Sequence, residues 1–318
     1  MNRNALCAMC AAIVLFAGGG VGAQTAGWKP TAGHKQIEIW PGEAPDARTP
    51  AGPEKVSLVN DQELVAGKPW LYVENVSRPT MTVYSPTGKN TGVAMMVFPG
   101  GGYEILAIDL EGTEVCDWLT SKGITCVLLK YRVPAHVPGE DWGLYRNSKM
   151  ALDDAQRAMG LVRLHAAEWH IDPHKIGVLG FSAGGHMVAA TTTNFGKRLY
   201  TPVDDADKAS CRPDFGVALY PGHLWNDKHL DDPIDNPTVQ VGRDTPPTFI
   251  VQAEDDPVDS VNNSLTYYAA LQKAGVPVEM HLYAHGGHAF GLRRTKEPIT
   301  AWPELVEKWL RAIGMVSD

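Results

Sequence analysis

Short apolar runs of strand length alternate with longer stretches of helical periodicity along most of the chain. The runs are apolar nearly throughout, instead of alternating between apolar and polar positions. Such runs are typical of parallel strands that are covered on both faces of a sheet. The pattern therefore predicts strands over residues 81–84, 93–98, 124–131, 176–179, 215–219, 248–252 and 278–282.

The segments between these runs predict the covering helices. In the clearest segment, the apolar residues fall on one face of a helix with 3.6 residues per turn. Gly123 and Gly275 stand where two of the helices should end, as glycine commonly does. The expected helices are residues 111–122, 148–168, 183–191, 260–273 and 302–313. Strands that alternate with helices predict an α/β fold, with a mostly parallel central sheet covered by helices on both faces.

The alternation also predicts the domain organisation. Residues 24–75 are rich in Pro and Gly and weakly periodic, so we expect an irregular arm that packs on the domain. Residues 76–318 hold no repeat, low-complexity tract or linker, and we expect one catalytic domain with little or no cap. Two Pro-, Gly- and Asp-rich loops, over residues 133–147 and 221–247, are the natural candidates to shape a substrate site.

The first 23 residues have the pattern of a cleaved signal peptide. Arg3 is followed by an apolar core over residues 5–17, and Val21-Gly22-Ala23 fits the small-x-small pattern before a cleavage point. The alternative is a membrane anchor, but the core is shorter than the roughly 20 residues that span a bilayer. We therefore expect a secreted or periplasmic protein without stable membrane association.

The charge of the chain argues against one class of partner. The formal net charge is −8 and no Lys- or Arg-rich run is present, which argues against a nucleic-acid partner.

Beyond the signal, the chain keeps three cysteines, Cys116, Cys126 and Cys211. Cys116 and Cys126 can form one bridge in an exported protein, although two buried thiols are an equal alternative. No Cys or His spacing resembles a structural zinc site, so we expect no metal and no cofactor.

The strongest chemical signal is Gly180-Phe181-Ser182-Ala183-Gly184-Gly185, between an expected strand and an expected helix. A serine on a tight strand-to-helix turn adopts a strained backbone and projects its hydroxyl group. The helix N-terminus also supplies amide groups and a positive dipole for a developing oxyanion. The context favours a nucleophilic Ser182 over an ordinary glycine-rich turn.

A second signal is Pro99-Gly100-Gly101-Gly102-Tyr103, which directly follows an apolar run. Acyl transfer needs amide groups aimed at the tetrahedral oxygen, and glycines let the backbone approach it closely. We expect the amides of Gly101, Gly102 and Ala183 to form this oxyanion hole. The alternative, a nucleotide-binding loop, is disfavoured because no phosphate-binding pattern follows.

Two later segments supply an acid and a base. Residues 253–258 (AEDDPV) and 285–291 (HGGHAFG) each follow an expected strand. A nucleophilic serine needs a histidine base and an orienting carboxylate. Asp256 is favoured over Asp255 because it follows a small residue by three positions and precedes a turn. His288 is favoured over His285 because the glycines before it leave room for the ring.

These segments together resemble the esterase and lipase side of the α/β-hydrolases, near hormone-sensitive-lipase-like and bacterial acetyl xylan or feruloyl esterase-like members. The Ser…Asp…His order is that of α/β-hydrolases. Pro99 departs from the family, where a histidine usually stands before the glycines. The matching segments, in chain order, are WPGEAPDA, FPGGGYEILA, YRVP, DDAQRAMGLVR, IGVLGFSAGGH, EDDPVDSVNNS and GGHAFGLR.

The resemblance implies an α/β-hydrolase fold and a serine esterase that removes short acyl groups, with acetyl on xylan favoured. The alternatives are a general short-chain or feruloyl-type esterase, a lipase, a prolyl-oligopeptidase-like peptidase and a non-catalytic glycan-binding protein. The expected partner is a small acyl ester or an acetylated oligosaccharide. Tyr103, Trp142 and His186 are candidates to contact it. The alternative for these three residues is a place in the core, which is favoured for His186.

Overall fold

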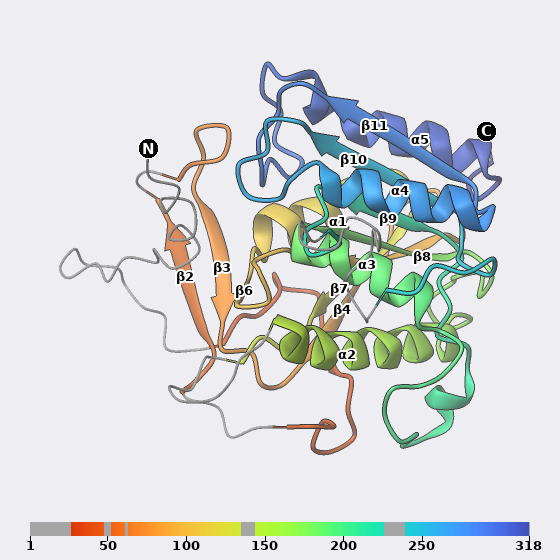
Figure 1. The fold of residues 1–318 in the computed structure, drawn as a ribbon. Helices are drawn as coiled ribbons and strands as arrows, with labels where there is room; N and C mark the ends of the chain where they lie inside the picture. The colour runs from red at the N-terminus through yellow and green to blue at the C-terminus, as the bar shows by residue number, and fades with distance from the viewer. Residues whose placement is uncertain (1–26, 48–51, 61–62, 135–143, 226–238, 318) are drawn as a thin grey trace.

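The computed structural model describes residues 27–47, 52–60, 63–134, 144–225 and 239–317 (Figure 1). Its main feature is an eight-stranded sheet with the order β1-β4-β7-β5-β8-β9-β10-β11. β1 pairs antiparallel with β4, which pairs antiparallel with β7, and all further pairs are parallel. The strands are β1 (Gln36–Glu38), β4 (Thr80–Tyr84), β5 (Ala94–Phe98), β7 (Thr125–Lys130), β8 (Ile176–Phe181), β9 (Gly216–Leu219), β10 (Thr248–Ala253) and β11 (Val278–Tyr283).

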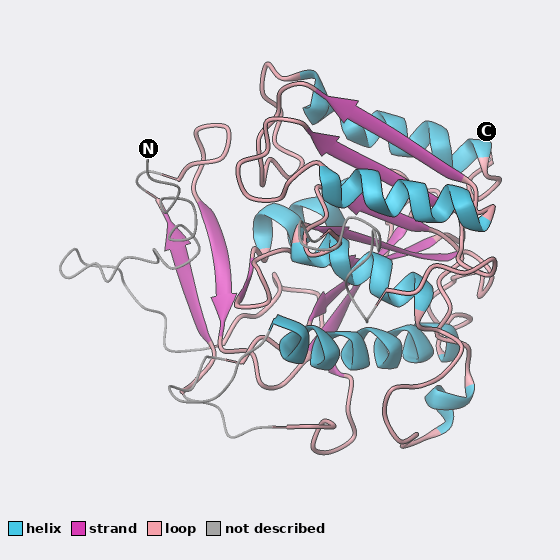
Figure 2. Cartoon of the chain, in the orientation of Figure 1, coloured by secondary structure: helices cyan, strands magenta, loops and turns pink. Residues whose placement is uncertain are grey.

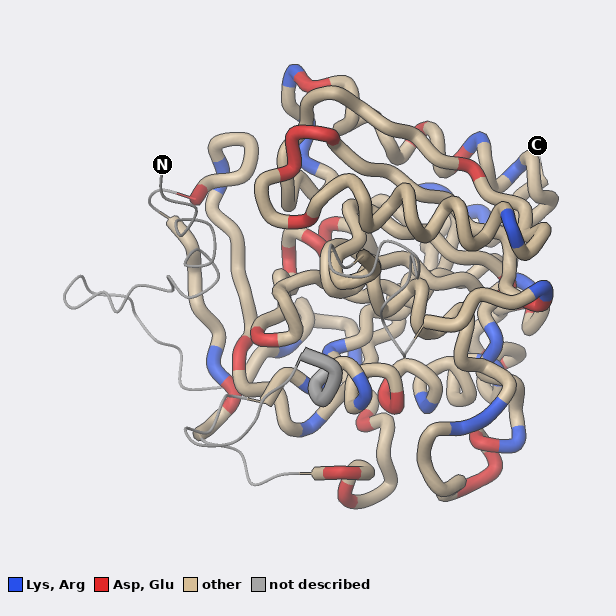
Figure 3. Tube along the Cα trace, viewed as in Figure 1, with Lys and Arg blue, Asp and Glu red and all other residues tan. Residues whose placement is uncertain are grey.

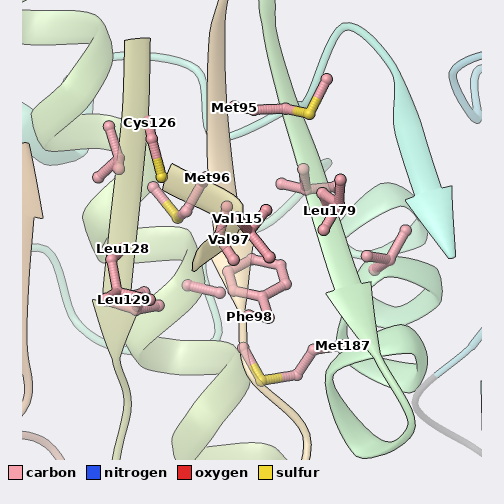
Figure 4. Close-up of a cluster of buried hydrophobic side chains, with 14 of the residues drawn as sticks. Met95, Met96, Val97, Phe98, Val115, Cys126, Leu128, Leu129, Leu179 and Met187 are labelled. Atoms are coloured by element: carbon pink, nitrogen blue, oxygen red, sulfur yellow. The ribbon is translucent and has the colours of Figure 1, made fainter. Parts of the chain in front are cut away.

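Each apolar run singled out in the sequence is a strand of this sheet. The strands β5, β7, β8, β9 and β10 are buried at every position, because helices cover both faces. Figure 4 shows part of the resulting core, where side chains of β5, β7 and β8 pack with others from the helices. The cluster includes Met95, Met96 and Phe98 of β5, and Met187 of α3 lies beside Phe98.

Five α-helices of the described chain cover the sheet. α2, α3 and α4 lie side by side in front of it in Figure 1, and Thr192 of α3 hydrogen-bonds Tyr267 of α4 at 3.1 Å. On the other face, the rings of Trp118 in α1 and Trp302 in α5 pack edge-on with centroids 5.2 Å apart. The helices are α1 (Glu114–Ser121), α2 (Leu144–Leu164), α3 (Ala183–Thr193), α4 (Asn262–Ala274) and α5 (Trp302–Ala312).

Helix boundaries differ from the sequence prediction at two places. The helix expected over 111–122 opens as a π-helical turn, Asp109–Thr113, before α1 begins. The helix expected over 148–168 begins and ends about one turn earlier, and residues after Leu164 continue as hydrogen-bonded turns. Short 3₁₀ turns also occupy Asp205–Lys208 and Pro298–Ala301.

Residues 24–75, expected to form an irregular arm, include three short strands in their described part. β1 extends the main sheet, and β2 (Lys55–Val59) pairs with β3 (Trp70–Glu74), which pairs with the two-residue β6 (Ile105–Leu106). The β2–β3 hairpin stands apart from the helices in Figure 2. These strands are short and only partly buried, so the local apolar pattern is too weak to predict them.

The structure settles the pairing of the cysteines in the described chain. A disulfide joins Cys116 of α1 to Cys126 of β7, while Cys211 is a buried free thiol.

Lys and Arg residues are interspersed with Asp and Glu residues along the trace in Figure 3. Within the described ranges, no helix has the length and apolarity to cross a bilayer. The expected signal peptide lies outside these ranges and stays a prediction.

Candidate active site

The candidate residues gather where the parallel strands end. The loops after β5, β8, β9, β10 and β11 leave the same edge of the sheet, toward which the arrowheads of β10 and β11 point in Figure 2. In open parallel sheets this carboxyl edge is where ligands bind.

Ser182 occupies a strained turn between β8 and α3. Its backbone angles are φ 52° and ψ −119°, a region that non-glycine residues rarely adopt. The turn demands glycine on both sides. A Cβ on Gly180 would lie 2.1 Å from the carbonyl oxygen of Gly184, and a Cβ on Gly184 would lie 2.1 Å from that of Phe98. The sequence pattern therefore encodes a close backbone crossing that projects the serine hydroxyl.

His288 lies between Ser182 and Asp256. Its Nε2 atom is 3.0 Å from Ser182 Oγ, and its Nδ1 atom is 2.7 Å from Asp256 Oδ2. The side chain of Asp256 is fully buried, and the amides of Val258 and Asp259 donate to its Oδ1 atom. The structure thus brings the three residues together in the geometry of a serine nucleophile, a base and an orienting acid.

Asp255 and His285, the alternatives for acid and base, form a separate pair. Their side chains approach to 3.2 Å at the surface, where that of His285 is 76% exposed. Asp255 Oδ1 accepts hydrogen bonds from the amides of Gly286 and Gly287, and these bonds lower the pKa of its carboxyl group. Asp255 therefore holds the loop that carries His288, while Asp256 is the carboxylate hydrogen-bonded to His288.

The surroundings of His288 favour its protonated form. Burial by itself lowers the pKa of the imidazole, but the hydrogen bond and charge of Asp256 oppose this effect. With the charges of Asp259 and Glu111 added, the pKa of His288 is raised above its ordinary value. The ring also packs edge-on against Tyr220, with centroids 4.9 Å apart.

The Pro99–Gly100 peptide, which leads into the glycine loop after β5, is held by hydrogen bonds at both its carbonyl and its amide group. Tyr131 donates to the carbonyl oxygen of Pro99 at 2.5 Å, and the amide of Gly100 donates to Glu111 at 2.7 Å. Gly101 has a φ of 131°, and a Cβ there would lie 2.3 Å from the carbonyl oxygen of Ile105. No acceptor among the described residues receives the amides of Gly101, Gly102 or Ala183. These amides remain available to an oxyanion.

Glu111 is a functional candidate that the sequence analysis missed. It is 2% exposed, and its two carboxylate oxygens accept from Gly100 and from the hydroxyl of Tyr220 at 2.8 Å. Burial raises the pKa of this carboxyl group, and its hydrogen bonds oppose the rise. The Tyr220 hydroxyl in turn accepts from the amide of Gly291, in the loop after His288. Glu111 thus links the glycine loop to the histidine loop.

Asp259 is the second residue that the sequence analysis missed. Ser182 Oγ donates to its Oδ2 atom at 3.2 Å, and the same oxygen lies 3.8 Å from His288 Nε2. Burial raises the pKa of Asp259 above its ordinary value, although the charges of His288 and His223 oppose the rise. The only sequence signal is a third aspartate shortly after Asp255 and Asp256.

Two of the three candidate substrate contacts form a buried pair. The hydroxyl of Tyr103 lies 2.6 Å from Nδ1 of His186, and each side chain is 1% exposed. Their rings pack against that of His223. Substrate contact by Tyr103 and His186 stays a prediction, and Trp142 lies outside the described residues. Within the described chain, no three His, Cys, Asp or Glu side chains are grouped to hold a metal ion.

Comparison with known proteins identifies relatives of this architecture. An acetylxylan esterase of Xylanibacter ruminicola is 28% identical over 250 residues, which cover 72% of this chain and 47% of that protein. The endo-1,4-beta-xylanase B of Butyrivibrio fibrisolvens is 29% identical over 215 residues, which cover 61% of this chain and 32% of that protein. The chain thus spans less than half the length of these two curated relatives.

A solved structure and a family model extend the comparison. The crystal structure of an acetyl ester-xyloside bifunctional hydrolase from Caldicellulosiruptor lactoaceticus matches with a TM-score of 0.67 and 31% identity. That match covers 89% of this chain and 97% of the other. A family model for the alpha/beta hydrolase fold matches residues 95–292, from β5 through the loop that carries His288. The chain belongs to the α/β-hydrolase fold family.

Proposed function

We propose that this chain is a serine carboxylic ester hydrolase that removes short acyl groups, acetyl above all, from a plant polysaccharide such as xylan. The observation that carries the proposal is the hydrogen-bonded line from Ser182 Oγ through His288 to the buried carboxylate of Asp256. A serine hydroxyl is a weak nucleophile until an adjacent base takes its proton, and this line supplies the base and its orienting acid.

The first half-reaction transfers the acyl group to the enzyme. Ser182 Oγ attacks the ester carbonyl carbon while His288 Nε2 takes the hydroxyl proton, and Asp256 stabilises the resulting imidazolium. The amides of Gly101, Gly102 and Ala183 receive the charge that develops on the carbonyl oxygen. The bond to the alcohol oxygen then breaks, and His288 gives its proton to that oxygen. The products are a free alcohol and an acyl-serine.

The second half-reaction releases the acid by the same route. A water molecule gives its proton to His288 and attacks the acyl carbon, and the amides again receive the oxyanion. Collapse of this intermediate returns the proton to Ser182 Oγ and frees the carboxylic acid. Each step uses protein groups and water alone, so the proposal includes no metal and no cofactor.

The choice of acetyl groups on xylan is supported by the relatives. One relative is named an acetylxylan esterase, another a xylanase, and the matching solved structure an acetyl ester-xyloside bifunctional hydrolase. The N-terminal pattern of a signal peptide supports a place outside the cytoplasm, where such a polymer occurs. Export is tested by the mass of the mature protein, which we expect to begin at Gln24.

The test compares acetate release from acetylated xylo-oligosaccharides with hydrolysis of p-nitrophenyl acetate, butyrate and octanoate. We expect the wild type to favour acetyl, and Ser182→Ala to lose about 10³-fold or more in kcat. Activity on the aryl esters without acetate from the glycan leaves a general or feruloyl-type esterase and removes the polysaccharide substrate. Full activity of Ser182→Ala removes the mechanism.

A further inference from the structure

The carboxylate of Asp259 is fixed beside the nucleophile. The backbone amide of Asp259 donates to Asp256 Oδ1 at 2.9 Å, and the backbone carbonyl oxygen of Asp259 accepts from the Gln252 side chain at 3.2 Å. The carboxylate also packs against Gly222, where a Cβ would lie 2.4 Å from Asp259 Oδ1. Its side chain is 12% exposed. The backbone that holds the acid partner of His288 therefore also sets the position of a second carboxylate, which accepts from Ser182 Oγ.

The proposed acyl transfer does not require this second carboxylate. Asp256 already orients His288, and a negative charge beside the attacking oxygen does not stabilise an oxyanion. Asp259 Oδ2 also competes with His288 Nε2 for the proton of Ser182 Oγ. The carboxylate of Asp259 is well fixed but takes no part in the proposed acyl transfer. A contact with the substrate explains its position better.

The position of Asp259 relative to His288 indicates which part of the substrate it meets. Because His288 Nε2 must protonate the departing alcohol oxygen, that oxygen has to come within about 3 Å of Nε2. Asp259 Oδ2 lies only 3.8 Å from the same nitrogen. A hydroxyl on the carbon adjacent to the esterified carbon lies about one hydrogen-bond length from the ester oxygen, roughly 3 Å, and so comes within reach of Asp259.

We propose that Asp259 recognises the alcohol part of the ester, by accepting a hydrogen bond from a free hydroxyl on the carbon adjacent to the esterified carbon. The substrate class is then the monoesters of vicinal diols, of which a partly acetylated sugar is one example. The inference rests on the proposed function, since it concerns the leaving group of the same reaction. When a substrate without this hydroxyl binds, it displaces water from the carboxylate without replacing the hydrogen bond.

The experiment uses two esters that differ only in this donor. 2-Hydroxyethyl acetate carries the adjacent hydroxyl, and 2-methoxyethyl acetate has it methylated. We expect wild-type kcat/KM to favour the hydroxyl ester by about ten-fold to a hundred-fold, the range for a hydrogen bond to a charged acceptor. The readout is the ratio of the two kcat/KM values, so a general loss of rate in a variant does not affect it.

Variants assign the preference to this side chain. Asp259→Ala should bring the ratio close to one, and Asp259→Asn should leave an intermediate ratio because its amide oxygen still accepts. Glu254→Gln, which removes a charge from an exposed residue of the same loop, should keep the wild-type ratio.

Two results overturn the assignment of Asp259. One is a wild-type ratio near one, and the other is an Asp259→Ala variant that keeps the preference or loses both esters in equal proportion. Wild-type protein that hydrolyses neither ester and no p-nitrophenyl acetate overturns the proposed function itself, and the inference with it.

Discussion

The hydrogen bond from the Gly100 amide to Glu111 leaves no room for a side chain at the glycine. The amide of Gly100 donates to Glu111 Oε2 at 2.7 Å, and a Cβ on Gly100 would lie 2.6 Å from that same oxygen. A buried carboxylate therefore aims the peptide that leads into the loop of Gly101 and Gly102. The position of these amides in the proposed oxyanion hole depends on a residue that does not itself contact the reacting atoms.

Glu111→Ala should lower kcat more than it raises KM. The substitution leaves the buried amide of Gly100 without its acceptor and lets the glycine loop relax, and loss of one oxyanion donor typically costs about 10²-fold. Glu111→Gln should cost less, because its amide oxygen can accept from Gly100 while its NH₂ group faces Tyr220. Steady-state kinetics on p-nitrophenyl acetate measure both variants. Equal losses in the two variants would show that charge matters here and hydrogen-bond geometry does not.

The pH dependence of kcat/KM should report His288. The proposed reaction needs the neutral imidazole, and the pKa of His288 is raised, so activity should fall on acidification at a midpoint above that of an ordinary histidine. Glu111→Gln removes one of the negative charges that raise this pKa, and the acid limb should therefore move to lower pH. A pH–rate profile of both proteins tests the sign. A shift to higher pH in Glu111→Gln would contradict the assignment.

The two adjacent aspartates should differ sharply. Asp256→Asn removes the charge that holds the tautomer of His288, and we expect kcat to fall by about 10³-fold or more. In Asp255→Asn the amide oxygen can still accept from Gly286 and Gly287, and we expect a loss of less than about tenfold. Kinetics at one pH, with circular dichroism to check folding, separate the two. Comparable losses would mean that the outer pair also serves the reaction.

Gly184→Ala should destabilise the fold as well as the site. The new Cβ meets the carbonyl oxygen of Phe98, so backbone must move, at a cost of about 2–3 kcal/mol. We expect Tm to fall by several degrees and kcat to fall with it. Gly196→Ala is the matched control, because nothing lies within 4 Å of a Cβ at that exposed glycine. A thermal melt in which the two variants behave alike would contradict the close crossing beneath Ser182.

The sequence by itself determined the parallel sheet and the place of Ser182. The buried strands are continuous apolar runs because both faces of the sheet are covered, and this pattern is readable without any tertiary contact. The turn at Ser182 is equally local, since Gly180 and Gly184 are required by a crossing of strand and helix within a few residues. The sequence also placed His288 and an aspartate after later strands, without fixing which of Asp255 and Asp256 faces the histidine.

Only the tertiary structure decided what each carboxylate does. Asp255 and Asp256 are neighbours in sequence, yet the hydrogen bonds of the loop direct one toward surface amides and the other toward His288. Glu111 meets Tyr220 across 109 residues, and Asp259 meets Ser182 across 77. In the sequence, nothing distinguishes Glu111 or Asp259 from a solvent-exposed acidic residue. Their partners are set by how the strands are ordered in the sheet. The strands of residues 24–75 were not predicted because they are short and only partly buried.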